Sequence, residues 1–396
     1  MSDDNSVVIV SACRTAIGTI MGSLRNMPAH DLGGTAIKAS LHQIKLEPDC
    51  VSEIILGQTL TAGQGQNPAR LAAFKAGVPV TVPAYGVNML CGSGLKAVYL
   101  AYQAIKSDEA TIVVAGGQES MSQAHHTSYM RNGTKYGNTM LKDSILCDGL
   151  TDPTLKMHMG DTAEALAQKY KISREQQDEF AVLSQQKTDD AMRNGHFARE
   201  IIPLIVRGKK DLIFREDEYP RPSTTVEILS KLSTVFSGPD NERTVTAGNS
   251  SGLNDGAAAL VLCKKATATA RNLTPLVTIV AFGQTGLEPI SMGLGPIEAI
   301  KLVLKKADWK IDDVDLFELN EAFAVQSIIV VDQLNIPMEK VNVCGGAIAL
   351  GHPIGCSGAR VLVTLIYNMI RLDKKKGIAA LCVGGGMGIA IAVQRE

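Results

Sequence analysis

The sequence AIKASLHQIKLEPDCVSEIIL at residues 36–56 is matched by AIKLVLKKADWKIDDVDLFEL at residues 299–319. The two stretches align without a gap at a spacing of 263 positions (299 minus 36), and both begin with Ala-Ile-Lys and end with Leu. Each reads as an amphipathic helix, a polar turn and then a strand, Glu53–Leu56 in one and Asp315–Leu319 in the other. Several identities in one register indicate that the chain contains two copies of one folding unit.

The repeat extends outward from these stretches. Ser93-Gly94-Leu95-Lys96 pairs with Ser357-Gly358-Ala359-Arg360 at a spacing of 264 positions (357 minus 93). Strands rich in Val and Ile are predicted at Val7–Val10, Glu53–Leu56 and Thr111–Ala115, and again at Val277–Ala281, Asp315–Leu319 and Ile378–Cys382. Strands that alternate with helices predict an α/β fold with a mostly parallel sheet and helices on its faces.

Between the two copies lies a stretch of different character, residues 122–250, which is richer in Asp, Lys, Gln and Arg. It holds a capping box, Ser173-Arg-Glu-Gln176, which predicts a helix running to about Gly195. We interpret this stretch as an insertion into the first copy. The predicted division is residues 1–121 plus 251–273 for the N-terminal half, 122–250 for a loop domain and 274–396 for the C-terminal half.

The composition excludes several classes of protein. The chain has 396 residues, a net charge of −1 and no basic run longer than Lys374–Lys376, which argues against nucleic acid or an anionic membrane as a partner. No apolar stretch reaches the roughly 18 residues of a membrane span. The eight cysteines form no CxxC pair, so neither a disulfide framework nor a zinc site is expected. The short acidic start, Met1–Ser6, leaves no room for a targeting peptide, and we expect a cytoplasmic protein.

Cys91 is the first candidate for chemistry. It lies in Asn88-Met-Leu-Cys-Gly-Ser-Gly94, directly before a helix predicted at Leu95–Ile105. Free N–H groups and the helix dipole at such an entrance favour the nucleophilic thiolate, whereas the alternative is a small buried core residue. The glycines also match a dinucleotide-binding pattern. The acids that follow, Asp108 and Glu109, fall in a predicted turn and not at the end of a strand, which argues against NAD.

Three further residues have side chains suited to catalysis. His352, between Gly351 and Pro353, could transfer protons near neutral pH or could simply close a turn. Cys382, which precedes a glycine run, could be an acid–base group or a small core residue. Asn320 could cap a turn or hold a water aimed at a substrate oxygen. The repeat places His352 and Cys91 on equivalent strand-to-helix turns, where such sheets gather their active sites.

Four blocks together resemble the signatures of the thiolase family. They are Asn88…Cys91-Gly-Ser-Gly94, Asn320-Glu-Ala-Phe323, Gly345-Gly-Ala-Ile-Ala-Leu-Gly-His352-Pro353 and Cys382-Val-Gly-Gly-Gly-Met-Gly388. The resemblance runs essentially from end to end, with the blocks in the family's order and spacing. It implies two similar βαβαβαββ halves packed in five layers, α-β-α-β-α, with a loop domain inserted in the first half. It also implies a homotetramer built as a dimer of dimers.

The activity implied by the resemblance is a reversible Claisen condensation of two acetyl-CoA molecules to acetoacetyl-CoA and CoA, with ping-pong kinetics. Cys91 would take the acetyl group after activation by His352. His352 and a water held by Asn320 would bind the thioester oxygen. Cys382 would remove a proton from the second acetyl-CoA. The N–H groups of Cys91 and Gly384 would hold the oxyanion of the acyl-enzyme.

The binding site is implied in the same way. Residues near the nucleotide and pantetheine of coenzyme A would be Arg221, Thr224 and Ser251, and residues at the acyl end would be His158, Met159, Met292 and Phe323. A Met at this place limits the acyl group and favours acetoacetyl-CoA over long 3-oxoacyl substrates. Coenzyme A is then a substrate carrier, and neither a resident cofactor nor a metal is expected.

A few positions depart from the family pattern. Cys344 and Cys356 replace a polar residue and a small Ala, and Asp161 replaces an apolar residue or Thr. Gln185 stands where potassium-activated members carry Tyr, which predicts that potassium does not activate the protein.

Three rival functions stay open at this point. A β-ketoacyl synthase shares the duplicated fold but uses Cys with two His, or with His and Asn, so Cys382 favours a thiolase. A degradative thiolase for 3-ketoacyl-CoA of many lengths differs only in substrate range. A non-catalytic protein that binds NAD or acyl-CoA would not become acetylated on Cys91. The direction of flux is also open, so thiolysis and a synthetic role in lipid metabolism, such as the mevalonate pathway, both fit.

Overall fold

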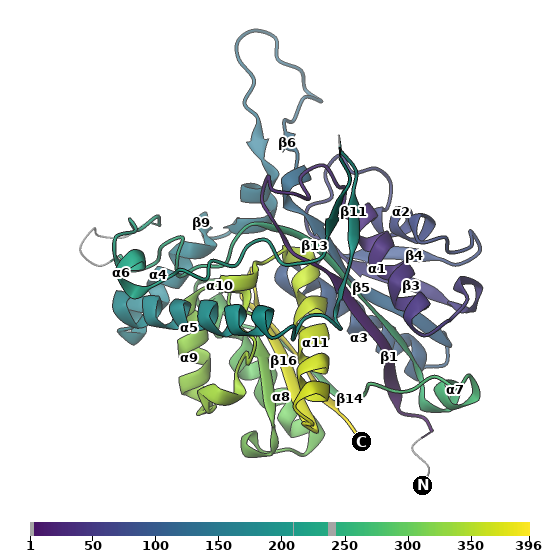
Figure 1. The fold of residues 1–396 in the computed structure, drawn as a ribbon. Helices are drawn as coiled ribbons and strands as arrows, with labels where there is room; N and C mark the ends of the chain where they lie inside the picture. The colour runs from purple at the N-terminus through teal and green to yellow at the C-terminus, as the bar shows by residue number, and fades with distance from the viewer. Residues whose placement is uncertain (1–3, 209, 237–242) are drawn as a thin grey trace.

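The computed structural model describes residues 4–208, 210–236 and 243–396, so the first three residues of the acidic N-terminal stretch lie outside it. One sheet of 11 strands runs through the molecule (Figure 1). Its main path is β4 (Ala84–Val87), β3 (Glu53–Gly57), β5 (Ile112–Ser120), β13 (Asn254–Lys264), β1 (Val7–Thr15), β14 (Val277–Gly286), β17 (Met387–Gln394), β16 (Lys376–Val383) and β15 (Leu316–Leu319). β2 (Gly18–Thr19) pairs with β13, and β10 (Ile201–Ile202) pairs with β1.

The strand order repeats within this sheet, which confirms the duplication. The path β3-β5-β13-β1 of the first half has the same neighbours as β15-β16-β17-β14 of the second half. β3 and β5 are parallel, as are β15 and β16, and the remaining pairs in both paths are antiparallel. The two halves join where β1 pairs with β14.

The prediction of a mostly parallel sheet is wrong, because β1, β13, β14 and β17 all run antiparallel to their neighbours on the path. A helix between two strands specifies a parallel crossover, but β16 continues directly into β17 through a tight turn. Gly385 and Gly386 both have φ +79° in that turn, a conformation that favours glycine. Alternation along the chain therefore predicted the crossovers and missed the hairpin.

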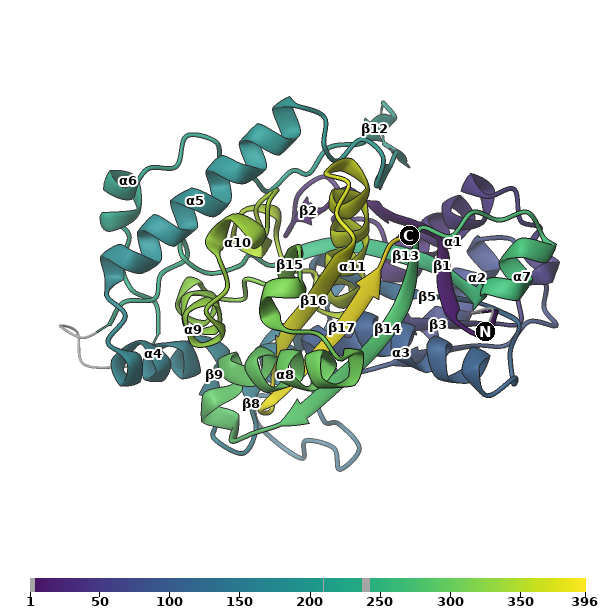
Figure 2. The ribbon, with the colours of Figure 1, turned by 90° about the horizontal axis from the view of Figure 1, so that it is seen from below.

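Helices and sheet halves form five layers, as the resemblance implied (Figures 1 and 2). α1 (Ala29–Gln43) and α2 (Pro68–Lys75) cover the outer face of the first half, and α8 (Gly295–Ala307) and α9 (Ala324–Leu334) cover the outer face of the second. α3 (Ser93–Lys106) and α11 (Ile354–Arg371) lie between the halves, where the largest apolar core forms. Figure 2 shows α8 in front of β14 and β17, which it contacts.

α3 and α11 touch through their backbones near their N-terminal ends. A Cβ on Gly94 would lie 2.6 Å from the nitrogen of Ala359, and a Cβ on Gly358 would lie 2.4 Å from the nitrogen of Leu95. Only glycine permits this approach, and the same need explains why Ser-Gly recurs in both copies. The contact draws together the turns that precede the two helices, which are the turns of Cys91 and His352.

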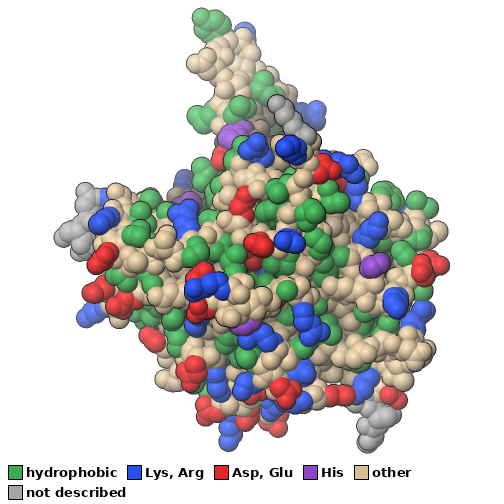
Figure 3. Space-filling view, in the orientation of Figure 1, with side chains coloured by type: hydrophobic (Ala, Val, Ile, Leu, Met, Phe, Trp, Pro, Cys, Tyr) green, Lys and Arg blue, Asp and Glu red, His purple; other side chains and the backbone are tan. Residues whose placement is uncertain are grey.

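The stretch between the copies carries its own elements. They are β6 (His126–Thr127), β7 (Lys142–Asp143), a π-helix (Ile145–Leu150), β8 (Thr151–Asp152), β9 (Met157–His158), α4 (Met159–Tyr170), α5 (Arg174–Arg193), β11 (Leu204–Val206), β12 (Leu212–Phe214) and α6 (Val226–Ser230). The predicted capping box at Ser173 and Gln176 is confirmed, and Asn194 caps the end of α5. β6 and β7 form the base of an arm that projects from the molecule (Figures 1 and 3).

Two short helices complete the chain, α7 (Lys265–Ala270) and α10 (Ala347–Leu350), together with single 3₁₀ turns. All eight cysteines are free thiols. Over the described part of the chain, each helix is too short or too polar to cross a membrane.

Candidate active site

Cys91 lies in a 3₁₀ turn, Leu90–Gly92, directly before α3. Leu90 has φ +48°, which is uncommon for a residue with a side chain. The hydroxyl of Ser93 fixes this turn, since it accepts the N–H of Met89 at 2.8 Å and donates to the carbonyl oxygen of Leu90 at 2.6 Å. The turn presents the thiol to two backbone N–H groups, its own and that of Gly384.

The N–H groups at the helix entrance favour the Cys91 thiolate, as expected, but they do not decide its protonation state. Burial raises the pKa of the Cys91 thiol to about 11, although the N–H groups of Gly384 and Cys91 itself lower it. The charge of Glu119 raises the pKa further. Desolvation outweighs the helix entrance, so the resting group is a thiol that needs a base.

His352 is built as that base. Its Nδ1 lies 2.5 Å from the hydroxyl oxygen of Ser357, whose own hydrogen is donated to the carbonyl oxygen of Pro353 at 2.9 Å. Nδ1 must therefore carry the ring proton, and Nε2 keeps its lone pair. Nε2 is buried and has no hydrogen-bond partner among the described residues. Burial, followed by the charge of Arg360, lowers the pKa of His352 to about 3, so the imidazole is neutral.

Asn320 stands at the end of β15, where its backbone N–H donates to the carbonyl oxygen of Ala380 at 3.0 Å. Its side chain is 1% exposed, and both amide atoms lack a partner within the described ranges. A buried amide in this state is suited to hold a water or a ligand oxygen. The side-chain amide of Asn320 thus offers a donor and an acceptor, without other partners in the described residues, to the water that it is predicted to orient.

Cys382 lies near the end of β16, and its sulfur is 3.3 Å from the side-chain amide of Gln326. Its pKa is raised, first by burial and then by the charge of Cys91. The second cause places the two sulfurs in one site. Two thiolates side by side repel each other, so the pair holds at least one proton in the resting protein.

The two halves of the fold meet at this site. The turn of Cys91 comes from the first half, and it contacts both α11 and β16 of the second half. His352 directly precedes α11, while Cys382 and Gly384 lie in and after β16. A Cβ on Gly384 would lie 2.8 Å from Cδ1 of Leu90, so a side chain there would displace the turn of Cys91. The structure therefore brings together the residues predicted to be catalytic.

The predicted acyl end is an apolar cluster beside Cys382. Met159, Met292 and Phe323 all belong to the cluster that contains the Cys382 side chain. The ring of Phe236, which the sequence analysis missed, meets the ring of Phe323 edge to face, with 6.2 Å between the ring centres. Its surroundings in the sequence, a polar turn-rich segment, gave no periodic signal that could have marked it.

His158 takes a structural part at this end. Its Nδ1 accepts the N–H of Gly160 at 3.0 Å and caps α4. Its ring stacks on the ring of Phe236, with 4.9 Å between the ring centres. Burial lowers its pKa, so the ring stays neutral. Asp161, noted above as a departure, accepts the N–H of His158 at 2.8 Å and completes a capping box. That carboxylate therefore serves the helix start.

Of the residues predicted to bind coenzyme A, Ser251 lies beside the loop of Asn320, and Arg221 and Thr224 lie in the segment that follows Tyr219. The N–H of Ser251 donates to the carbonyl oxygen of Ala322 at 3.0 Å, which fixes it next to the loop of Asn320. The ring of Tyr219 packs on Gly252, and the guanidinium of Arg221 lies 5.6 Å from the centre of that ring. Arg221 is exposed, and its carbonyl oxygen accepts the hydroxyl of Thr224 at 2.8 Å. An exposed cation in this place is free to meet a phosphate.

Glu119 is a second residue that the sequence analysis missed. Its buried carboxylate accepts N–H groups from Thr59 at 3.0 Å, Leu60 at 3.2 Å and Gly355 at 2.8 Å. Burial raises its pKa to about 7, although these N–H groups lower it. It ties the first half to the start of α11, close to His352. It lies between Gln118 and Ser120, beyond the predicted strand Thr111–Ala115, and nothing in that setting marked it in the sequence.

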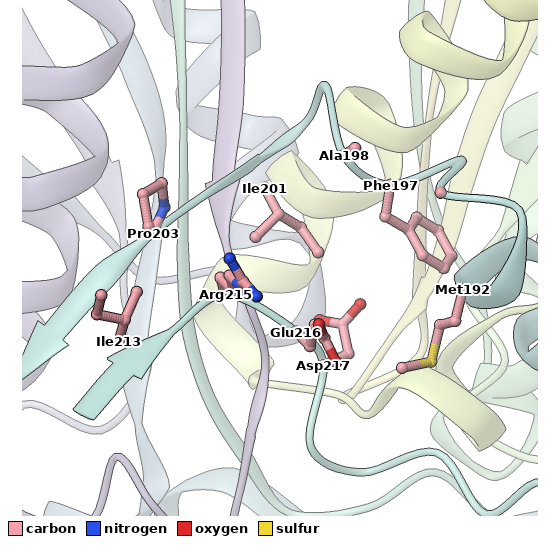
Figure 4. A pocket seen from close by; sticks show the side chains of 10 residues that line it. Met192, Phe197, Ala198, Ile201, Pro203, Ile213, Arg215, Glu216 and Asp217 are labelled. Atoms are coloured by element: carbon pink, nitrogen blue, oxygen red, sulfur yellow. The ribbon is translucent and has the colours of Figure 1, made fainter.

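A cavity of about 570 Å³ lies beside α5 and the hairpin of β11 and β12 (Figure 4). It is lined by Met192, Gly195, Phe197, Ala198, Ile201, Pro203, Ile213, Arg215, Glu216 and Asp217. None of the residues predicted to act on a substrate is among them.

Comparison with known proteins identifies the family. Residues 7–266 match the thiolase N-terminal domain, and residues 273–395 match the thiolase C-terminal domain. The chain is 53% identical over 390 residues to the cytosolic acetyl-CoA acetyltransferase of Rattus norvegicus, covering 98% of each chain. It is 52% identical over 398 residues to the acetyl-CoA acetyltransferase of Thiocystis violacea, covering 100% of each.

Solved structures agree with these matches. The Bacillus anthracis acetyl-CoA acetyltransferase superposes with a TM-score of 0.95 at 40% identity, covering 98% of both chains. The human mitochondrial 3-ketoacyl-CoA thiolase superposes with the same TM-score of 0.95 and 40% identity, covering 100% of both chains. With two domain matches that span nearly all of its length and full-length relatives above half identity, this chain belongs to the thiolase family.

Proposed function

We propose that this protein is an acetyl-CoA C-acetyltransferase, which condenses two acetyl-CoA molecules to acetoacetyl-CoA and CoA and also catalyses the reverse thiolysis. The observation that carries the proposal is the pairing of two thiols, the partly buried Cys91 and the buried Cys382, with a neutral imidazole whose Nε2 has no partner among the described residues. One thiol can carry the acetyl group while the other moves the proton of the second substrate. The names of the relatives at 52–53% identity support the same reaction.

In the first half-reaction the thiol proton of Cys91 passes to Nε2 of His352 as its sulfur attacks the thioester carbon. The oxyanion that forms is held by the protonated Nε2 and by a water on Asn320. When the carbon–sulfur bond to coenzyme A breaks, the leaving sulfur takes the proton of Cys382. The products are acetyl-Cys91, free CoA, a protonated His352 and a Cys382 thiolate.

In the second half-reaction the Cys382 thiolate removes a methyl proton from the next acetyl-CoA. The resulting carbon attacks the acetyl group on Cys91, and the oxyanion points at the N–H groups of Cys91 and Gly384. Collapse releases acetoacetyl-CoA and the sulfur of Cys91, which takes the proton back from His352. Each group ends in its starting protonation state, so the cycle closes.

The mass of the protein after incubation with acetyl-CoA tests this proposal. One acetyl group should appear on Cys91, and a Cys91→Ala variant should gain none there. A Cys382→Ser variant should still become acetylated but should lose condensation. Normal condensation by the Cys382→Ser variant would disprove the assignment of the base.

A degradative thiolase for 3-ketoacyl-CoA of many lengths is the second candidate. The human mitochondrial enzyme of that name shares the fold at 40% identity. The apolar cluster of Met159, Met292 and Phe323 next to Cys382 favours a small acyl group. Rates of thiolysis for acyl chains of increasing length separate the two, since a short-chain enzyme should lose activity steeply beyond acetoacetyl-CoA.

Location, assembly and cofactor needs belong to the same proposal. We infer a cytoplasmic homotetramer, a dimer of dimers, that uses CoA only as a substrate carrier, needs no resident cofactor or metal, and has neither nucleic acid nor membrane as a partner. We retain the division into two halves and a loop domain at residues 122–250. The relative from rat is named cytosolic, which supports the location. The arm between β6 and β7 exposes Tyr129 and Tyr136, the latter 99% exposed, which supports contact between subunits. The mass of the assembly in solution tests the tetramer.

A further inference from the structure

Gln326 is a buried amide that the reaction above does not use. It lies in the first turn of α9 and is 1% exposed. Its side chain is 3.3 Å from the sulfur of Cys382 on one side. The same end of the amide faces the carbonyl oxygen of Asn320 at 3.1 Å. The other end faces the backbone N–H of Ser327 at 2.7 Å.

These neighbours decide which way the amide points. The carbonyl oxygen of Asn320 can only accept a hydrogen bond, and the N–H of Ser327 can only donate one. The amide nitrogen must therefore face Asn320, and the amide oxygen must face Ser327. The nitrogen carries two hydrogens, and the one not directed at Asn320 is available to the sulfur of Cys382.

Packing holds Gln326 in this place. A Cβ on Gly293 would lie 2.7 Å from Cβ of Gln326, so the 3₁₀ turn Pro289–Leu294, which precedes α8, packs directly against the base of the side chain. The side chain is thus fixed at both ends, by Gly293 at its base and by Asn320 and Ser327 at its tip.

We propose that Gln326 is a positioning residue for Cys382, whose side-chain N–H points at the sulfur and stabilises the thiolate that Cys382 becomes during the reaction. This inference rests on the proposed function, in which Cys382 is the base. A buried thiolate without a donor is strongly disfavoured, and hydrogen bonds to the charged form offset that cost. The second N–H, directed at Asn320, ties the base to the residue proposed to hold the water.

Two variants of similar size test the donor. Gln326→Met keeps the length of the side chain but has no N–H, and Gln326→Glu replaces the donor by a second acceptor. The readout is the exchange of methyl protons of acetyl-CoA with deuterated water as a function of pH, which reports proton removal by Cys382. Acetylation of Cys91, measured by mass, shows that each variant is folded and has an intact first half-reaction.

We expect both variants to become acetylated. The rising limb of their exchange profiles should move to higher pH, further for Glu than for Met, because a carboxylate repels the thiolate. Condensation should fall by roughly ten- to a hundredfold, the effect of a positioning partner. Gln177→Met, which alters another buried glutamine in α5, is the matched control and should leave the profile in place.

The outcomes separate the inference from the proposed function. An unmoved profile in Gln326→Met, with exchange abolished in Cys382→Ser, would overturn the role of Gln326 and leave the base in place. An equal loss at every pH would likewise mean that Gln326 only supports the fold. Exchange that persists in Cys382→Ser would remove the proposed base and the inference with it.

Discussion

Nδ1 of His352 lies 2.5 Å from the hydroxyl oxygen of Ser357, five positions later in the first turns of α11. This contact fixes both the ring orientation and the tautomer, because the Ser357 hydrogen is already donated to Pro353. Nε2 therefore keeps its lone pair because Nδ1, on the other side of the ring, is held by a hydroxyl.

Removal of this hydroxyl should slow acyl transfer. In Ser357→Ala the ring can rotate or change tautomer, and we expect the single-turnover rate of Cys91 acetylation to fall by roughly ten- to a hundredfold. Ser40→Ala is the control, since Ser40 is another buried helical serine whose hydroxyl bonds only to a carbonyl oxygen, that of Ile37. Equal rates in both variants would show that the Ser357 contact does not set the tautomer.

Because His352 stays neutral in the folded protein, the unfolding free energy should decrease as the pH falls below 6.5. Its pKa is about 3 in the folded protein, below the 6.5 of a free histidine, so the unfolded chain takes up a proton that the folded chain refuses. Below pH 6.5 this group should remove about 1.4 kcal/mol of unfolding free energy per pH unit. Urea unfolding between pH 5 and pH 8 measures the slope, which should be shallower in His352→Asn. Identical slopes would mean that native His352 protonates normally.

Alkylation of Cys91 should keep accelerating at alkaline pH. With the thiol pKa raised to about 11 by burial, the thiolate fraction grows about tenfold per unit through pH 9. Peptide mapping after short exposure to iodoacetamide gives the rate at each pH. A plateau below pH 8 would contradict the raised pKa and restore the thiolate expected from the helix entrance.

Replacement of Glu119 should lower both the unfolding free energy of the protein and the rate of Cys91 acetylation. Glu119→Ala leaves the N–H groups of Thr59, Leu60 and Gly355 without their acceptor, and we expect a loss of about 3 kcal/mol or more in unfolding free energy. Acetylation of Cys91 should also slow, because Gly355 lies in the first turn of α11, which follows His352 directly. The exposed Glu298→Ala is the control and should change stability by no more than about 0.5 kcal/mol.

Potassium should not change the activity. The amide of Gln185 is already used, since its oxygen accepts the N–H of Arg221 at 2.8 Å and its nitrogen donates to Ile348 at 3.5 Å. Rates of acetoacetyl-CoA thiolysis in potassium and in sodium chloride of equal ionic strength should agree. A severalfold increase in potassium alone would refute this expectation.

Features that depend on short stretches of the sequence could be predicted. The register of residues 36–56 against 299–319 reappears as the shared strand order of the two halves. The capping box at Ser173 begins α5 as expected. Such signals depend on periodicity and on contacts three or four residues apart, which the sequence displays directly.

Other features could not be predicted because they depend on parts of the chain that are far apart in the sequence. The sheet is mixed because β17 returns beside β16, a choice of turn geometry at Gly385 and Gly386. The Cys91 thiol is protonated because desolvation raises its pKa more than the N–H groups of Cys91 and Gly384 lower it, and a helix entrance in the sequence cannot reveal that balance. Gln326 and Glu119 did not stand out in the sequence, since the contacts that give them a role, to Cys382 and to Gly355, join residues that are far apart in the chain.

The order of residues establishes that there are two copies of one unit and shows which glycine-rich turns carry a cysteine or a histidine. The protonation state of these groups is set by the folded molecule. A pKa depends on burial, on neighbouring charges and on the donors that face each atom, and these are set where the two halves pack together through Gly94 and Gly358.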